Sequence, residues 1–253
     1  MTAVAAGPGR IEALLRKDRE VAVATLVTVT ALSWTLIVAD AGMENPTPAR
    51  WTPALGLAMG LMWWIMMIAM MLPSAAPAIL LAAALRRKSR PERPPYGSTA
   101  GFAGGYLAAW TFFSVAATAA QWALDTAGLL TPAMRSSSST LSGATLVAAG
   151  LWQLTPAKRA CLRHCRSPAE LLTRHRRNGR AGDFRMGVEL GAYCLGCCGF
   201  LMALLFVGGV MDFAWIAGLT AYVLVEKLLP GGETLARLAG TGLAIWGAVL
   251  LIA

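Results

Sequence analysis

Charged side chains are scarce in this sequence of 253 residues. They make up 14 % of the chain, whereas about 25 % is usual for a soluble domain. Hydrophobic residues make up 57 %, and the mean hydropathy is +0.58. This composition excludes a disordered chain, a disulfide-rich secreted domain and most soluble enzymes. It predicts an integral membrane protein.

Motifs of common enzyme classes are also missing. The sequence has no Walker loop, dinucleotide-binding glycine pattern, nucleophile elbow or zinc-protease helix motif. Without an activated nucleophile or a phosphate cradle, a hydrolase or transferase is the least supported class. We therefore favour a protein that is not an enzyme, and we expect no catalytic residues.

Long apolar runs dominate the chain. A helix that crosses a bilayer needs about 20 apolar residues. Seven runs are candidates, namely 21–39, 54–85, 100–124, 141–154, 186–211, 213–228 and 234–253. The expected fold class is therefore all-α, a polytopic helical membrane protein with about seven transmembrane helices. The second run contains Pro73 and Pro77, which remove backbone donors and predict a kinked helix or a helix followed by a second short one.

The distribution of Lys and Arg predicts the orientation. If the N-terminus is inside, alternating connections place 20 of the 22 basic residues inside and only Arg50 and Arg135 outside. The positive-inside rule therefore favours a multi-pass protein of a cytoplasmic membrane. We expect residues 1–20 to be a cytoplasmic N-terminal segment and residues 21–253 to form a single helical membrane domain.

Residues 155–185 form the longest basic loop of this arrangement and are expected to be cytoplasmic. Its capping residues and prolines predict two short helices, over 156–166 and 168–177. Topology and contact with anionic lipid account for its positive charge. The bilayer is therefore an expected partner, and nucleic acid is not.

All five cysteines lie within 38 residues, in two groups. On helices, the members of each group share a face with Cβ atoms about 5–6 Å apart, whereas a disulfide needs roughly 3.5–4.5 Å. A metal ion between the sulfurs is therefore easier to accommodate than a disulfide within a group. The two groups could converge at the inner membrane boundary. The candidate ligands are Cys161, Cys165, Cys194, Cys197 and Cys198, and His164 is either a further ligand or a solvated loop residue.

Methionine, the other sulfur-containing residue, is also abundant, with 12 in the chain. Six lie in the second apolar run, at positions 59, 62, 66, 67, 70 and 71, and four of these follow one helix face. Such a stripe usually serves packing, but thioethers also suit Cu(I). Thiolates together with thioethers favour copper as the bound ion, with zinc as the alternative at a Cys/His site.

Three strings carry a resemblance to a known family. They are AMMLPS at 69–74, CLRHC at 161–165 and CLGCC at 194–198. The set resembles the bacterial family described as predicted metal-binding integral membrane proteins, a domain of unknown function. The resemblance implies a polytopic protein of the bacterial inner membrane with a metal site. It carries over to Met70, Met71, Met211, Glu226 and the five cysteines, whereas Leu190 stands where the family often has histidine.

Three hypotheses follow. In the first, the cysteines hold copper, Met66, Met70 and Met71 relay it, and the protein transports it or delivers it to a membrane cuproenzyme, with a metallochaperone as another possible partner. In the second, Cys194 and Cys197 form the C-x-x-C pair of a membrane thiol–disulfide oxidoreductase. In the third, the protein is a non-catalytic assembly subunit whose Cys and Met residues only pack.

Overall fold

A computed structural model of the chain describes residues 8–41, 51–89, 94–174 and 179–252. The described residues are mostly helical and contain no strand, apart from an isolated bridge between Leu130 and Ser136. The helices of this part of the chain are α1 (Pro8–Ala41), α2 (Pro53–Ser89), α3 (Tyr96–Thr126), α4 (Ser139–Leu154), α5 (Pro156–Arg166), α6 (Pro168–Arg174), α7 (Arg180–Ala203), α8 (Leu205–Gly208), α9 (Phe213–Leu228) and α10 (Gly232–Ile252). The all-α fold class is confirmed.

Five helical segments are long and apolar enough to cross a membrane. They are Glu12–Ala39, Pro53–Ser89, Tyr96–Thr126, Arg180–Gly208 and Gly232–Ile252. The other two expected spans correspond to α4 and α9, which have 16 residues each. A helix of that length measures about 24 Å, less than the roughly 30 Å of a hydrocarbon core. The expected number of seven spans is therefore not confirmed.

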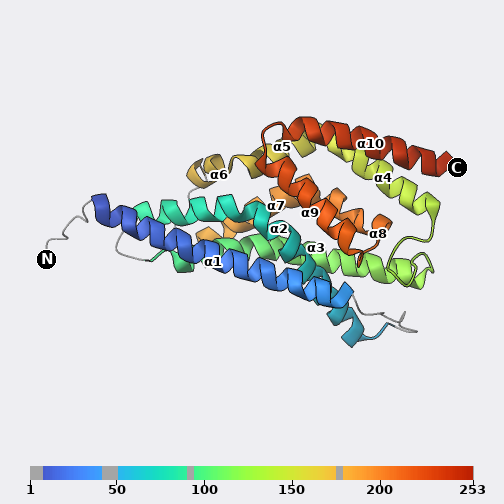
Figure 1. The fold of residues 1–253 in the computed structure, drawn as a ribbon, viewed down its shortest axis with the longest axis horizontal. Helices are drawn as coiled ribbons and strands as arrows, with labels where there is room; N and C mark the ends of the chain where they lie inside the picture. The colour runs from blue at the N-terminus through green and yellow to red at the C-terminus, as the bar shows by residue number, and fades with distance from the viewer. Residues whose placement is uncertain (1–7, 42–50, 90–93, 175–178, 253) are drawn as a thin grey trace.

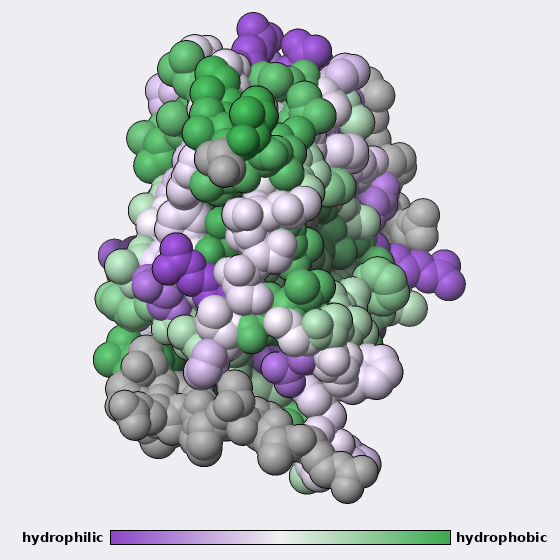
Figure 2. All heavy atoms as spheres, turned by 90° about the vertical axis from the view of Figure 1, so that its right-hand side faces the viewer, coloured by the Kyte–Doolittle hydropathy of each residue, from purple (hydrophilic) through white to green (hydrophobic). Residues whose placement is uncertain are grey.

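The outer helices carry apolar side chains on exposed faces. α1 packs against α2, and Val27, Leu32 and Leu36 on it are more than half exposed. Figure 2 shows hydrophobic side chains gathered where α10 ends, and Ile245 and Ile252 there are also exposed. Apolar surface of this extent on helices of this length is compatible with a lipid environment.

The long helices lie roughly along one axis, with the start of α1 and the end of α10 at opposite ends (Figure 1). α3 packs against α7, and α4 packs against α10. The expected helix over 156–166 is confirmed as α5, and α6 accounts for 168–174; the remainder of the expected 168–177 helix falls outside the described residues. The expected boundary between residues 20 and 21 lies within α1, which is continuous.

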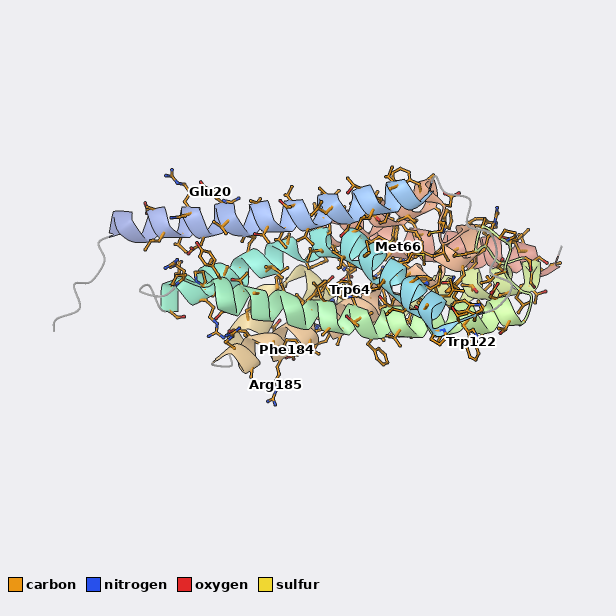
Figure 3. The ribbon with its side chains drawn as sticks, turned by 90° about the horizontal axis from the view of Figure 1, so that it is seen from below. Glu20, Trp64, Met66, Trp122, Phe184 and Arg185 are labelled. Atoms are coloured by element: carbon orange, nitrogen blue, oxygen red, sulfur yellow. The ribbon has the colours of Figure 1, made fainter. Side chains whose placement is uncertain are left out.

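The second span is one helix that contains both prolines. α2 runs from Pro53 to Ser89 without interruption and bends along its length (Figure 3). Close to Pro73, the Ser74 hydroxyl donates to the carbonyl of Met71 at 2.8 Å. The sequence expectation of a bent second span thus agrees with the structure.

Glycines let α3 and α7 cross at backbone contact. A Cβ atom on Gly187 would meet the carbonyl oxygen of Phe102, and one on Gly191 would lie 2.6 Å from the Cβ of Ala109 and 3.0 Å from the carbonyl oxygen of Tyr106. Small residues at a crossing permit this close approach between membrane helices. The crossing brings Tyr106 of α3 against the segment of α7 that carries three cysteines.

We expect Gly187→Ala to lower stability by about 1–3 kcal/mol, because the new methyl group overpacks the crossing. Thermal unfolding of the purified, detergent-solubilised protein measures this change. Gly199→Ala is the matched control on α7, since a Cβ at Gly199 meets nothing within 4 Å. Equal effects of the two substitutions would show that the crossing is not tightly constrained.

Candidate metal centre

Three cysteine sulfurs from two helices form a compact cluster. The Sγ atoms of Cys165 on α5 and of Cys194 and Cys197 on α7 all lie within 4.8 Å of one another. Cys194 and Cys197 are buried, and Cys165 is half-buried. The two sequence groups of cysteines therefore converge, although not all their members join the cluster. Below, "the three-cysteine cluster" means these three residues.

Local sequence places α5 beside α7. Thr155 caps α5 by accepting a hydrogen bond from the amide of Lys158 at 3.1 Å, and Pro156 fits the first turn. The cap fixes where α5 begins, and hence which residues face α7. Gly196 then allows α5 to approach closely, since a Cβ at this position would lie 2.6 Å from Cys161 Sγ.

Lys227 is the cation of the cluster. Its Nζ atom donates to Cys194 Sγ at 2.9 Å and to Ser74 Oγ at 3.2 Å, and the side chain is buried. An ammonium group is buried at great cost unless it has partners. The partners of this ammonium are therefore a cysteine sulfur of α7 and a serine hydroxyl of α2.

Tyr106 connects the cluster to the methionine-rich helix. Its hydroxyl donates to the carbonyl of Met71 at 3.1 Å and also lies 3.1 Å from Cys194 Sγ. Both residues are almost fully buried, so the contacts are shielded from solvent. Side chains or backbone from α2, α3, α5, α7 and α9 thus meet at one place in the bundle.

The two remaining cysteines lie beside the cluster. Cys198 Sγ is 3.3 Å from Cys197 Sγ, and Cys197 Sγ is 3.7 Å from Cys165 Sγ. Cys161 packs against Gly196 and is not one of the three clustered sulfurs. All five are free thiols in this structure.

The short helix α5 carries two thiols whose acidity is low. A hydrogen bond with Cys194 and burial raise the pKa of Cys165 well above its usual range, and burial raises the pKa of Cys161. Cys165 is therefore protonated at neutral pH in the metal-free protein. A metal ion that binds there must displace the proton, because the thiolate is the ligand.

Glu226 is engaged by a lysine. Its carboxylate oxygen Oε1 accepts a hydrogen bond from the Nζ atom of Lys158, and both side chains are completely buried. Burial lowers the pKa of Lys158 to about 8, so most of this lysine is still charged at pH 7. The pair connects α5 to α9 next to the cluster. Within the part of the chain that the structure describes, the Glu226 carboxylate makes no hydrogen bond to a cysteine sulfur.

The other expected ligands have separate surroundings. His164 stacks on Tyr193 with ring centroids 4.3 Å apart and bonds to the carbonyl of Ala160. Met211 precedes α9, 16 residues before Lys227, which is about 24 Å of helix from the cluster. Neither residue is brought to the three-cysteine cluster.

The expected methionine relay lies on α2. Met66, Met70 and Met71 are fully buried there, and the backbone of Met71 contacts Tyr106.

Sequence reasoning missed the residues that surround the sulfurs. Tyr106 gave no signal, because isolated hydroxyl residues are common in apolar helices, and Ser74 entered only as the last residue of the AMMLPS string. Lys227 did give one, since a charged residue inside an apolar span is costly and marks a functional position by default. The two charged neighbours have separate partners in the structure, since Glu226 pairs with Lys158 and Lys227 contacts Cys194.

The donor set fits a soft metal ion. Thiolates select Cu(I) and Zn(II) among common biological ions, and three sulfurs within 4.8 Å of one another can bind one ion after small side-chain movements. The part of the chain that the structure describes contains no other group of three Cys, His, Asp or Glu ligands this close together.

Comparison with known proteins gives one finding. A family model described as "PpoB2: Copper chaperone" matches residues 60–250, a segment that contains every residue of the three-cysteine cluster. No curated protein and no solved structure shows a significant match to the chain.

We expect Lys158→Met to lower stability by about 3–5 kcal/mol, because Glu226 is left as an unpaired buried charge. The double variant Lys158→Met/Glu226→Met should recover much of this loss, since it removes both charges. Thermal unfolding in detergent measures both effects. A double variant that is less stable than either single variant would show that the pair is not a simple buried ion pair.

Proposed function

The chain belongs to the copper chaperone family, and on this premise we propose that it binds Cu(I) at Cys165, Cys194 and Cys197 and delivers it to a membrane cuproenzyme. Copper is the cargo of this protein and not a resident cofactor. The observation that carries the proposal is the convergence of three thiols from α5 and α7 within 4.8 Å.

The number of ligands favours copper over zinc. Structural zinc sites are almost always closed by four protein ligands, whereas the cluster offers three sulfurs. Cys198 is adjacent, but its sulfur is not within the compact group. A soft ion that accepts three thiolates matches this geometry and the family description. Zinc remains the alternative ion that a metal analysis would detect.

Three thiolates around Cu(I) require a positive charge close by. Three thiolates and one Cu(I) carry two net negative charges, which are costly in a buried site. Lys227 offsets one of them through its contact with Cys194 Sγ at 2.9 Å. Lys158 of α5 is paired with Glu226 and does not offset the second charge.

The proposed setting is the bacterial inner membrane. Five membrane-length apolar helices and the concentration of basic residues in 1–20, 86–98 and 155–185 support this placement. We retain the orientation inferred from charge, with residues 1–20 and the loop over 155–185 in the cytoplasm and residues 21–253 as a single helical domain.

The half-buried Cys165 is the ligand best placed for exchange with a partner. It lies on an 11-residue helix that is too short to span a bilayer, near the helix end. A donor on such a helix can contact a metallochaperone or enzyme, while Cys194 and Cys197 stay buried. The chaperone description favours delivery over transport, and Met66, Met70 and Met71 are the proposed relay.

One observation favours a second candidate function. The sulfurs of Cys165 and Cys197 are 3.7 Å apart on two different helices, so small movements would allow a disulfide. The protein could then act as a thiol–disulfide oxidoreductase. Mass shifts after alkylation in graded redox buffers distinguish this function, because it requires a reversible pair of thiols.

The copper proposal predicts a specific loss of metal. We expect purified protein to retain about one equivalent of Cu(I) against a chelator strong enough to remove copper from thioethers, measured by mass spectrometry of the metal. Cys165→Ser/Cys194→Ser/Cys197→Ser should lose it, and Cys161→Ser, a control outside the cluster, should retain it. Copper that stays in the triple variant would contradict the proposed site. Zinc in place of copper would contradict the proposed identity of the ion.

The role of Lys227 predicts a change in affinity. Lys227→Met should raise the Kd for Cu(I) about 10- to 100-fold, as is typical when a hydrogen-bonding partner of a metal ligand is removed. Lys88→Met, which removes an exposed lysine from the end of α2, should leave the Kd unchanged. Chelator competition measures both values, and an unchanged Kd for Lys227→Met would refute the charge-offset role.

A further inference from the structure

A buried glutamine holds two methionine sulfurs at a distance from the cysteines. Gln121 of α3 is 3 % exposed, and its Nε2 atom lies 3.5 Å from Met59 Sδ and 3.2 Å from Met134 Sδ. Met59 is on α2, and Met134 is in the connection between α3 and α4. Two thioethers from separate segments therefore converge on one nitrogen atom.

The orientation of this amide is fixed by a tryptophan. Trp63 is completely buried, and its indole Nε1 atom donates to Gln121 Oε1 at 2.7 Å. An indole N–H can only donate, so the amide oxygen must face it. The NH₂ group must then face the sulfurs, which makes the convergence of Met59 and Met134 a built feature.

The backbone at Met134 adds a second observation. Its φ angle is 54°, the left-handed region, which a residue with a side chain adopts infrequently. The connection is held there by bonds from Ser136 N to the carbonyl of Phe206 at 2.7 Å and from Met134 N to the carbonyl of Thr131 at 2.8 Å. Unfavourable backbone conformations persist where surrounding contacts impose them, and they are concentrated at functional sites.

We propose that Met59 and Met134 form a second site for a soft monovalent ion, a thioether site for Cu(I). This proposal depends on the proposed function only for the identity of the ion, Cu(I). Both sulfurs contact the same nitrogen, so they are at most about 6.7 Å apart, the sum of the two contact distances. Two metal–sulfur bonds of about 2.3 Å, the length of zinc–thiolate bonds, would hold the sulfurs at most about 4.6 Å apart, and the unbranched methionine side chain can make this movement.

The position of the pair suits the exchange of an ion with a partner. Met59 precedes Met71 by 12 residues, about 18 Å along a helix, and α2 carries thioethers at Met62, Met66, Met67 and Met70 between them. Met66, Met67, Met70 and Met71 are fully buried, whereas Met59 and Met134 are half-buried. Figure 3 places Trp122, the neighbour of Gln121, near the end of the bundle, away from the middle of α2 where Met66 lies.

A thioether differs from a thiol in a useful way. It is neutral and has no proton to lose, so an ion bound there keeps its charge and binds more weakly than at thiolates. A weak, half-buried site can release an ion that the three-cysteine cluster would hold. Met59 and Met134 would therefore be the place where the row of methionines along α2 exchanges an ion with a partner.

Silver ion, a redox-inert soft monovalent probe, tests the site by its stoichiometry. We expect full-length protein in detergent to bind about two Ag(I) ions in equilibrium dialysis without chelator. In a Cys161→Ser/Cys198→Ser background, which removes the two other thiols, Cys165→Ser/Cys194→Ser/Cys197→Ser should bind one, Met59→Leu/Met134→Leu should bind one, and the combined variant should bind none. Met186→Leu, which removes a buried thioether near the start of α7, should still bind two. Leucine conserves volume, and size-exclusion elution checks folding.

The outcomes separate the two proposals. If the cysteine variant binds no Ag(I), or if Met59→Leu/Met134→Leu loses none, the thioether site is refuted and the cysteine site is unaffected. If the wild type binds a single ion that only Met59→Leu/Met134→Leu removes, the thioether site stands and the three-cysteine cluster fails. Loss of Ag(I) in the Met186→Leu control would show that the methionine effect is not specific to this pair.

Discussion

The burial of a lysine ammonium beside a cysteine sulfur is the constraint on which the centre of this molecule depends. An isolated ammonium in an apolar bundle would be too costly to keep, so the contacts of Lys227 with Cys194 and Ser74 must be maintained together. They require α2, α7 and α9 to hold fixed relative positions. Tyr106 adds α3 to the same set of contacts.

The glycines of the α3–α7 crossing serve this requirement. Gly187 and Gly191 remove the side chains that would hold the two backbones apart, and the resulting distance is what lets the Tyr106 hydroxyl reach Cys194. On the other side of α7, Gly196 plays the same part for α5 and Cys161. Small residues on α7 thus bring both α3 and α5 close to the helix that carries Cys194 and Cys197.

Local features of the fold could be predicted from the sequence. The proline and threonine at 155–156 act within one turn, so the start of α5 was correctly placed, and the apolar runs gave the long helices. The end of the fifth expected span was less accurate, because α7 stops at Ala203 and α8 follows. Nothing in the hydropathy of 186–211 marks that change, which depends on neighbouring helices.

The composition of the site was only partly predictable. Spacing put Cys194 and Cys197 on one helix face, but the choice of Cys165 over Cys161 depends on how α5 rotates against Gly196. The convergence of Met59 and Met134 on Gln121 joins segments more than 60 residues apart in sequence, and no periodicity encodes such a contact. Long-range packing therefore decides which of many sulfurs become neighbours.

The sulfurs of the cluster come from α5 and α7, and the lysine that faces them comes from α9. A chain emerging from the ribosome exposes Cys165 long before Cys194, and Lys227 later still. Until α9 has been made and packed, the cluster lacks the lysine that contacts Cys194 Sγ. The complete set of contacts around the sulfurs therefore forms only after the last of these three helices has joined the other two.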